Sequence, residues 1–302
     1  MLDPLSEILG ANIVPDLVSS IAERTRREQP AFAPLDRSLI FLLLVFWCLL
    51  PQASPATQMP GTTLQGTNRD AEPKTIAMLA PVRAPAAGKS NYRVTLKLLD
   101  GTHVGNYSVT VKDNGDAWTV TGYWPRTGNT SGEITDVATL EKGTLLLRKE
   151  AFQRFPNQAG QTSNPVTIDL DFTGNTVTGT TTSAGADGTP VSAELSAPTY
   201  PGGVAIDVVI GCLPLAKGYA VTYRYWNVQT LKEGALQVKV VGTERIAVPV
   251  GTFDSWKLEL TTVDGSERGT LWIAKDSRTP IKSSGSKTVG PNTFYSSTEL
   301  VP

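Results

Sequence analysis

The sequence predicts an all-β protein, an antiparallel meander that forms a large curved sheet (a half-barrel) or two stacked sheets, after an N-terminal helical or apolar segment. From Tyr92 onward, short segments in which apolar and polar residues alternate follow one another, as in half-buried strands. Turn pairs such as Asp100-Gly101 and Asn114-Gly115 separate these segments. A single short helix, near residues 204–212, is expected among the strands.

Residues 1–38 are expected to form an amphipathic or extended N-terminal region. Leu2, Leu5, Leu9 and Ile13 have the spacing of one helical face, and Pro15 interrupts it. Such a segment is typical of a helix that lies on the cytoplasmic membrane face or on a partner subunit. The alternative is a start codon assigned too far upstream, so that these residues merely precede a signal peptide.

Residues 39–56 are expected to be a signal peptide or a short membrane anchor. Residues 39–50 are uninterrupted apolar sequence, preceded by Arg37 and followed by a small-residue run that ends at Ala56. As a helix this run would be about 18 Å long, which is short of the roughly 30 Å hydrocarbon core and favours a signal cleaved near Ala56. Because no arginine follows until Arg69, the rest of the chain is expected outside the cytoplasm in either case.

Residues 57–90 are rich in Pro, Ala and Thr and show no periodicity, which predicts an extended linker. The β domain is expected to span residues 91–302. Its first half should contain strands at residues 93–99, 104–112, 117–124, 133–140, 144–149, 166–172, 176–182 and 191–195.

The densest strand and turn signals lie in residues 213–284. Leu236, Val238 and Val240 alternate with polar residues, and so do Trp256, Leu258 and Leu260. Pro249 and Gly251 between these two runs predict that the chain turns and returns beside itself. Asp264-Gly265 then predicts a second hairpin, with a type I′ turn, into a strand at residues 270–274.

Four motifs in this part of the chain carry a family resemblance: residues 213–219 (LPLAKGY), 241–244 (VGTE), 248–256 (VPVGTFDSW) and 271–273 (LWI). They resemble the LPLxxGY, VxGxE, VPxGTFxxW and TLW pattern of a family of bacterial cell-envelope domains of unknown function. The resemblance spans roughly residues 91–301. It implies an antiparallel half-barrel similar to the lipoprotein carriers of the Lol system, and it implies no catalytic residues.

Composition and single residues argue against several activities. The formal net charge of −1 offers no basic excess for nucleic acid. His103 is the sole histidine, so a His-based metal cluster is excluded, and its place in a hairpin predicts a solvent-exposed side chain. Cys212 is expected to be a small buried hydrophobe without a disulfide to Cys48. Asp169 and Asp171 share a strand face and are expected to point outward. We therefore expect no catalytic residue, metal or cofactor.

The remaining candidates are aromatic. Tyr219, Tyr223 and Tyr225 should point one way along a strand, and Trp256 and Trp272 should lie on neighbouring strands of a hairpin. One interpretation is that these five residues line a concave face that admits an apolar ligand such as an acyl chain. The alternative is that the rings fill the core, since a curved sheet needs large side chains.

These observations predict a non-enzymatic envelope domain that binds a lipid or lipoprotein. The alternative is a membrane-tethered accessory or structural subunit of a larger membrane protein complex. The expected partners are a membrane surface or membrane protein, contacted through residues 1–50, and an apolar ligand, but no nucleic acid. The expected location is periplasmic or otherwise extracytoplasmic, either secreted after cleavage near Ala56 or anchored to the inner membrane.

Overall fold

The computed structural model describes residues 76–99, 101–126, 132–155, 165–183 and 187–302. The expectations for residues 1–38 and 39–56, and for the larger part of the linker, lie outside these ranges. Within the described residues, no helix is long and apolar enough to cross a membrane.

Fifteen strands form one sheet in the order β8-β7-β6-β5-β4-β3-β2-β1-β15-β14-β13-β12-β11-β10-β9. All neighbouring pairs are antiparallel except β9 and β10, which run parallel. The strands are β1 (Gly88–Leu98), β2 (Gly101–Asp113), β3 (Ala117–Trp124), β4 (Glu133–Glu141), β5 (Leu147–Phe155), β6 (Val166–Thr173), β7 (Thr176–Ser183), β8 (Thr189–Glu194), β9 (Tyr200–Pro201), β10 (Ala220–Asn227), β11 (Lys232–Val248), β12 (Gly251–Thr262), β13 (Glu267–Ala274), β14 (Pro280–Val289) and β15 (Asn292–Val301).

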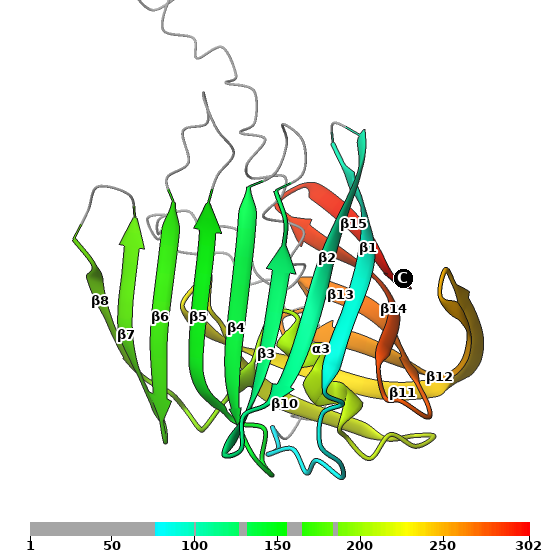
Figure 1. The fold of residues 1–302 in the computed structure, drawn as a ribbon, viewed down its shortest axis with the longest axis horizontal. Helices are drawn as coiled ribbons and strands as arrows, with labels where there is room; N and C mark the ends of the chain where they lie inside the picture. The colour runs from blue at the N-terminus through cyan, green and yellow to red at the C-terminus, as the bar shows by residue number, and fades with distance from the viewer. Residues whose placement is uncertain (1–75, 100, 127–131, 156–164, 184–186) are drawn as a thin grey trace, which may run out of the picture. The chain divides into compact units, whose positions relative to one another are not determined.

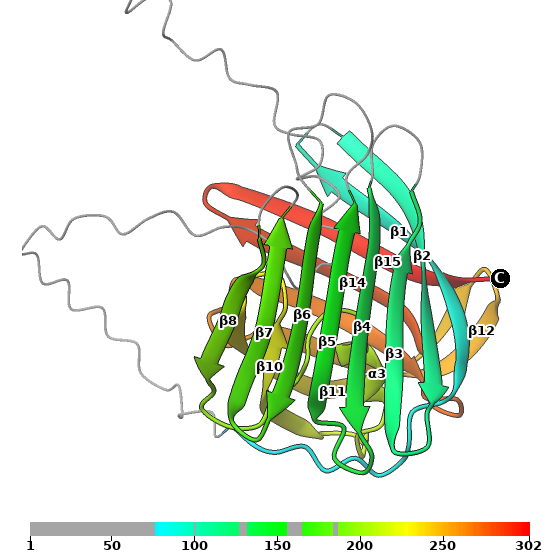
Figure 2. The same ribbon diagram turned by 60° about the vertical axis from the view of Figure 1, so that its left-hand side comes forward.

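The sheet is strongly curved. Strands β1–β8 form one wall, and β10–β15 cross behind it at an angle (Figure 1). Figure 2 shows the same two walls from a second direction. A sheet with this many twisted strands cannot stay flat, so its two halves come to face one another. We call the surfaces that the walls turn toward each other the inner face. The predicted large curved sheet is therefore confirmed, and the two-sheet alternative is not observed.

Helix α3 (Ala205–Gly211) lies between the two walls. It contacts β3 in one wall and β14 in the other, as well as β9. Its apolar residues Ile206, Val209 and Ile210 are fully buried, because the helix is surrounded by the curved sheet rather than by solvent. The helix near residues 204–212 was predicted, whereas its position inside the sheet was not.

Residues 76–87, which we call the strap, run along one end of the walls before β1 begins (Figure 2). Three hydrogen bonds donated by backbone N–H groups fix the strap: Ala77 N donates to Thr222 O at 2.8 Å, Leu79 N to the side-chain hydroxyl of Tyr200 at 2.8 Å, and Val82 N to Cys212 O at 2.9 Å. The side chain of Leu79 is buried in the core. Residues 76–87 of the expected linker are therefore packed onto the β domain.

The strands largely follow the predicted ranges, with one correction at β5. This strand was expected at residues 144–149 but spans Leu147–Phe155. Leu145 adopts a positive φ of 61°, which ends any extended run before it. Glu150 and Arg154 stand at inward positions of the true strand, so they interrupt the apolar alternation that would have identified it.

The second correction concerns the turn between β12 and β13. A type I′ turn requires a positive φ at both central residues, but here only Gly265 has one, at 74°. Instead Gly265 N donates to Thr262 O at 2.9 Å, so the tight turn is centred on Val263 and Asp264 and Gly265 follows it. The hairpin itself is confirmed, as is the one at Pro249, where Val248 pairs with Gly251.

Candidate ligand-binding interior

The inner face is built by the register of the sheet, because directly opposed residues of antiparallel neighbours point to the same side. Tyr92 on β1 stands between Tyr107 on β2 and Leu300 on β15. On the other wall, Leu258 on β12 stands between Val240 and Leu271. Buried aromatic and aliphatic side chains thus line most of the inner face.

One stretch of the inner face carries only small residues. Ser283 on β14 lies between Leu271 and Thr298, and Gly285 lies between Gly269 and Ser296. Small side chains leave room above the sheet, and narrow cavities are found there.

Gly122 on β3 provides the place where α3 meets the first wall. A Cβ at Gly122 would lie 2.6 Å from Val204 Cγ2 and 2.8 Å from the Trp124 ring, closer than such atoms approach. Val204 begins the helix, so the missing side chain of Gly122 lets α3 approach the sheet. The sequence contains no local signal for this contact, because Gly122 lies within a regular strand.

Three adjoining cavities surround α3. The largest, which we call the strap cavity, has a volume of about 250 Å³ and lies between residues 84–90, the end of α3 and the turn that holds Arg278. It shares Tyr92, Val109 and Val208 with a cavity of about 20 Å³. That cavity in turn shares Asp207 and Thr298 with one of about 40 Å³ over the small-residue stretch. The two smaller spaces have room for a few water molecules at most.

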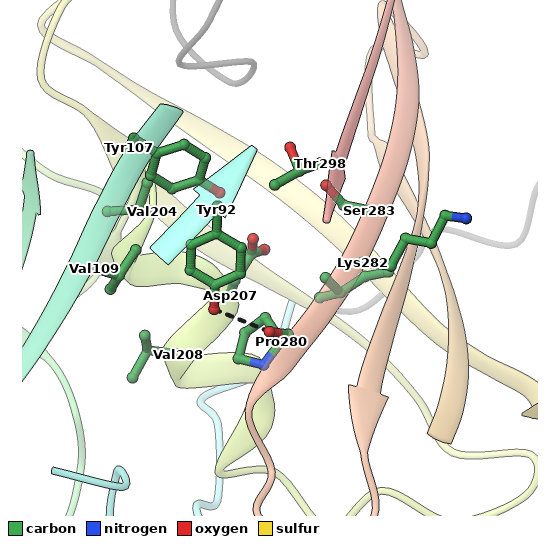
Figure 3. A pocket seen from close by; sticks show the side chains of 11 residues that line it. Tyr92, Tyr107, Val109, Val204, Asp207, Val208, Pro280, Lys282, Ser283 and Thr298 are labelled. Atoms are coloured by element: carbon green, nitrogen blue, oxygen red, sulfur yellow. Dashed lines mark hydrogen bonds between the residues drawn. The ribbon is translucent and has the colours of Figure 1, made fainter. Parts of the chain in front are cut away.

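Asp207 is the polar side chain that α3 presents to the two small cavities. Figure 3 shows its carboxylate beside the ring of Tyr92, with Thr298 and Ser283 across the space and the Lys282 ammonium directed away. Burial raises the pKa of Asp207 to about 7. No hydrogen bond to Asp207 is found among the described residues, so nothing there stabilises its ionised carboxylate. The side chain therefore stays protonated until the pH is near neutral.

The rings next to Asp207 form a stack. Tyr107 stacks between Tyr92 and Trp124, with ring centroids 5.0 and 5.2 Å away. The Tyr92 hydroxyl donates to Pro280 O at 2.9 Å, which joins the two walls (Figure 3). Burial raises the pKa values of both tyrosines, and the nearby Asp207 charge adds to this effect. Both therefore remain neutral phenols.

A buried acid pair lies elsewhere on the inner face of the first wall. Asp136 on β4 and Glu150 on β5 are diagonal neighbours and are 3% and 1% exposed. Burial raises the pKa of Asp136 to about 7. Burial, and then the charge of Asp136, hold the pKa of Glu150 well above its usual range. Both Glu150 oxygens and Asp136 Oδ1 lack hydrogen-bond partners among the described residues, so the pair is stable in the fold mainly when protonated.

The five aromatic candidates separate into two groups. Tyr223 is fully buried opposite Leu236, and Tyr225 occupies the space left by Gly234. Trp256 is half-buried on the same face as Leu258, with Lys275 Nζ 5.1 Å above its ring. Tyr219 precedes β10 and is half-buried.

Trp272 lies on the outer face instead. It stands opposite Lys257 and Lys282, donates from Nε1 to Glu244 Oε2 at 3.0 Å, and packs in a separate small cluster with Ile246 and Val248. The five residues therefore do not form one surface, and none of them lines the three cavities around α3. Their role in ligand binding stays a prediction.

The residues considered for chemistry occupy structural positions. Cys212 is buried and free, and burial raises the pKa of its thiol to about 11, so it is not a ready nucleophile. Asp169 and Asp171 are exposed, and Asp171 pairs with Lys149 at 2.7 Å. His103 is half-buried rather than exposed, on β2 opposite Leu96. Within the described ranges, no group of three or more His, Cys, Asp or Glu residues is placed to hold a metal ion.

Fold and interior together define a class of protein, an open and strongly curved antiparallel sheet that encloses a short helix and internal cavities. The chain belongs to the family described as protein of unknown function (DUF3108), whose model matches residues 91–295. This agrees with the predicted membership of an unknown-function family, whereas the motif pattern proposed for that family stays a prediction.

Solved structures and curated proteins add little more. A crystal structure of a β-barrel-like protein of domain of unknown function DUF1849 from Brucella abortus matches with 10% identity and a TM-score of 0.47, over 70% of this chain and 94% of that chain. The hypothetical lipoprotein YmcC from Escherichia coli K12 matches with 9% identity and a TM-score of 0.29, over 70% of this chain and 84% of that chain. No curated protein matches.

Proposed function

We propose that this chain is a non-enzymatic, extracytoplasmic envelope domain that holds an apolar or amphiphilic ligand against the inner face of its sheet. The observation that carries the proposal is the strap cavity of about 250 Å³ beside α3. An apolar cavity of about 150 Å³ is sufficient to bind benzene, so this space is large enough for a short aliphatic chain. Val109, Val111 and Val208 supply its apolar wall.

Three further features support the non-enzymatic part of the proposal. The thiol of Cys212 is buried and protonated, and the paired carboxylates Asp169 and Asp171 are ordinary surface charges. The internal acids Asp136 and Glu150 face a packed core and line none of the three cavities around α3. None of these groups therefore combines exposure in a cavity with a neighbouring acid, base or nucleophile.

The envelope location rests on the sequence. The apolar run of residues 39–50 has arginines before it, which favours export of the β domain, either secreted or anchored to the inner membrane. A reporter enzyme that is active only outside the cytoplasm, fused after Pro302, is expected to be active. Activity of a cytoplasm-only reporter at the same position would overturn this assignment.

Ligand binding is tested by titration of the full chain with a dansyl-labelled undecanoate, whose emission rises in an apolar environment. We expect saturable binding that decanoate or decanol displaces. Val208→Trp should fill the strap cavity and weaken binding, whereas Val241→Trp, at an exposed position on β11, should not. Absence of saturable binding to the folded wild type would refute the proposal.

A further inference from the structure

Two arginines that form no ion pair among the described residues meet at the turn between β13 and β14, and one of them lines the strap cavity. Arg278 lies in the turn between β13 and β14 and lines the cavity. Arg83 reaches the same turn from the strap, where its Nη1 donates to Asp276 O at 3.3 Å. Among the described residues, neither arginine forms an ion pair. Arg83 is close enough that its charge lowers the pKa of Arg278.

Arg278 is held in an unfavourable backbone conformation. Its φ of 61° is one that glycine adopts readily and that a long side chain adopts at some cost. Partial burial and the Arg83 charge lower the pKa of its guanidinium, so the fold brings two like charges close together at this turn. A strained backbone at a residue, and a second positive charge beside it, both reduce stability. Such features are often retained for function.

A purely structural role explains only part of this arrangement. Arg278 Nη1 donates to Leu213 O at 3.4 Å, so the guanidinium lies near the C-terminal end of α3, where positive charge is favourable. However, Arg278 Nε is buried without a hydrogen-bond partner among the described residues. A buried N–H donor without an acceptor is costly, so the contact with Leu213 O does not satisfy the whole guanidinium.

The rest of the cavity lining fits the chain of an amphiphile. None of the described residues that line it is acidic, and Lys89 adds a second basic residue to Arg278 in its lining. The opposite wall is aliphatic, with Val109, Val111 and Val208. Asp207 directly precedes the lining residue Val208 in the sequence. Its carboxyl lines the two adjoining small cavities and not the strap cavity.

We propose that the strap cavity binds an aliphatic oxyanion, a carboxylate or phosphate monoester on a short hydrocarbon chain. The guanidinium of Arg278, with Arg83 beside it, holds the anionic group, and the valine wall holds the chain. A planar guanidinium suits both oxyanions because its N–H groups match two oxygens at once. This inference rests on the proposed function and adds the chemical class of the ligand.

The test compares four competitors for the dansyl-labelled undecanoate on the full chain: decanoate, decyl phosphate, decanol and inorganic phosphate. We expect the affinity of both anionic amphiphiles to be about tenfold or more higher than that of decanol. One charge-assisted hydrogen bond contributes a difference of this size. Inorganic phosphate alone should compete weakly. Arg278→Gly should abolish the preference for the anions while leaving decanol affinity unchanged, and glycine suits the backbone at this position.

Arg245→Gln is the matched control, because this arginine is exposed on β11 away from the cavity, and it should change neither affinity. Arg83→Gln should reduce the preference by a smaller factor. If Arg278→Gly lowers the melting temperature but keeps the preference, Arg278 only stabilises the end of α3 and the inference is wrong. Equal binding of decanol and decanoate to the wild type also overturns it, while leaving the proposed function intact. If inorganic phosphate competes as well as decyl phosphate, the cavity is a site for free anions and the inference is wrong. If no amphiphile binds, both proposals are wrong.

Discussion

Single residues with a positive φ give the sharpest tests of the backbone. Gly265 has a φ of 74° and Gly242 does not have a positive φ, yet a Cβ added to either would meet open space. Gly265→Ala should therefore cost about 1–2 kcal/mol of unfolding free energy, from conformation alone. Gly242→Ala should be neutral within about 0.5 kcal/mol. Denaturant melts of both variants measure the difference, and equal stabilities would show that the turn at Gly265 is misassigned.

The buried acids predict how stability depends on pH. Asp136 and Asp207 have ordinary pKa values of 3.8 that burial raises to about 7, and the pKa of Glu150 is raised as well. At pH values between the unfolded pKa and the raised folded pKa, the folded state therefore binds more protons than the unfolded state. Their contribution to stability is fully present below the unfolded pKa, and is lost as pH rises through about 7.

We expect a higher melting temperature at pH 5 than at pH 8. The double variant Asp136→Asn, Glu150→Gln should lose much of this slope, because neutral amides do not ionise. Asp169→Asn, which changes an exposed carboxylate, should keep it. A wild-type protein that gains stability between pH 5 and pH 8 would contradict the assigned burial of these acids.

At the scale of elements, the contact between α3 and β3 depends on Gly122. A Cβ there would overlap Val204 and Trp124, so Gly122→Ala should destabilise the fold by roughly 1–3 kcal/mol. Val204→Ala should relieve part of this cost, which makes the two substitutions non-additive in a double-mutant cycle. Simple additivity of the two stability changes would show that α3 does not sit against Gly122.

Most strands were predictable because their signals are local. Alternation and turn residues identify β3 and the hairpin at Pro249 without any knowledge of distant contacts. The strand β5 was misplaced because Glu150 and Arg154 occupy inward positions, where the alternation rule expects apolar residues. A leucine with a positive φ, Leu145, is equally invisible to pattern analysis.

The candidate site was less predictable, because it depends on contacts between segments far apart in the chain. Arg278 and Arg83 carry no motif, and only the packing of the strap, α3 and the β13–β14 turn brings them together. The aromatic residues had a clearer sequence signal. Trp272 nevertheless lies on the outer face, because it alternates with Leu271 and Ile273 on β13.

At the scale of the whole molecule, one open sheet makes both walls, and its two edge strands do not pair with each other. Strands β8 and β9 follow each other in the chain but form the two edges, while β1 joins β15 in the middle of the sheet. The segment between β9 and β10 then enters the space between the walls as α3. The cavities follow from this topology, because a short helix does not fill all the space that the curved sheet encloses.

The central claim is that an aliphatic chain lies against the inner face beside α3. Its most direct test is quenching of tryptophan emission by decanoate brominated at its terminal carbon, since bromine quenches at contact distance. Tyr92 lines the strap cavity, whereas Tyr295 is 55% exposed on β15. We predict that the emission added by Tyr92→Trp is quenched saturably and that the emission added by Tyr295→Trp is not. Equal quenching of the two variants, or quenching of Tyr295→Trp alone, would contradict the account.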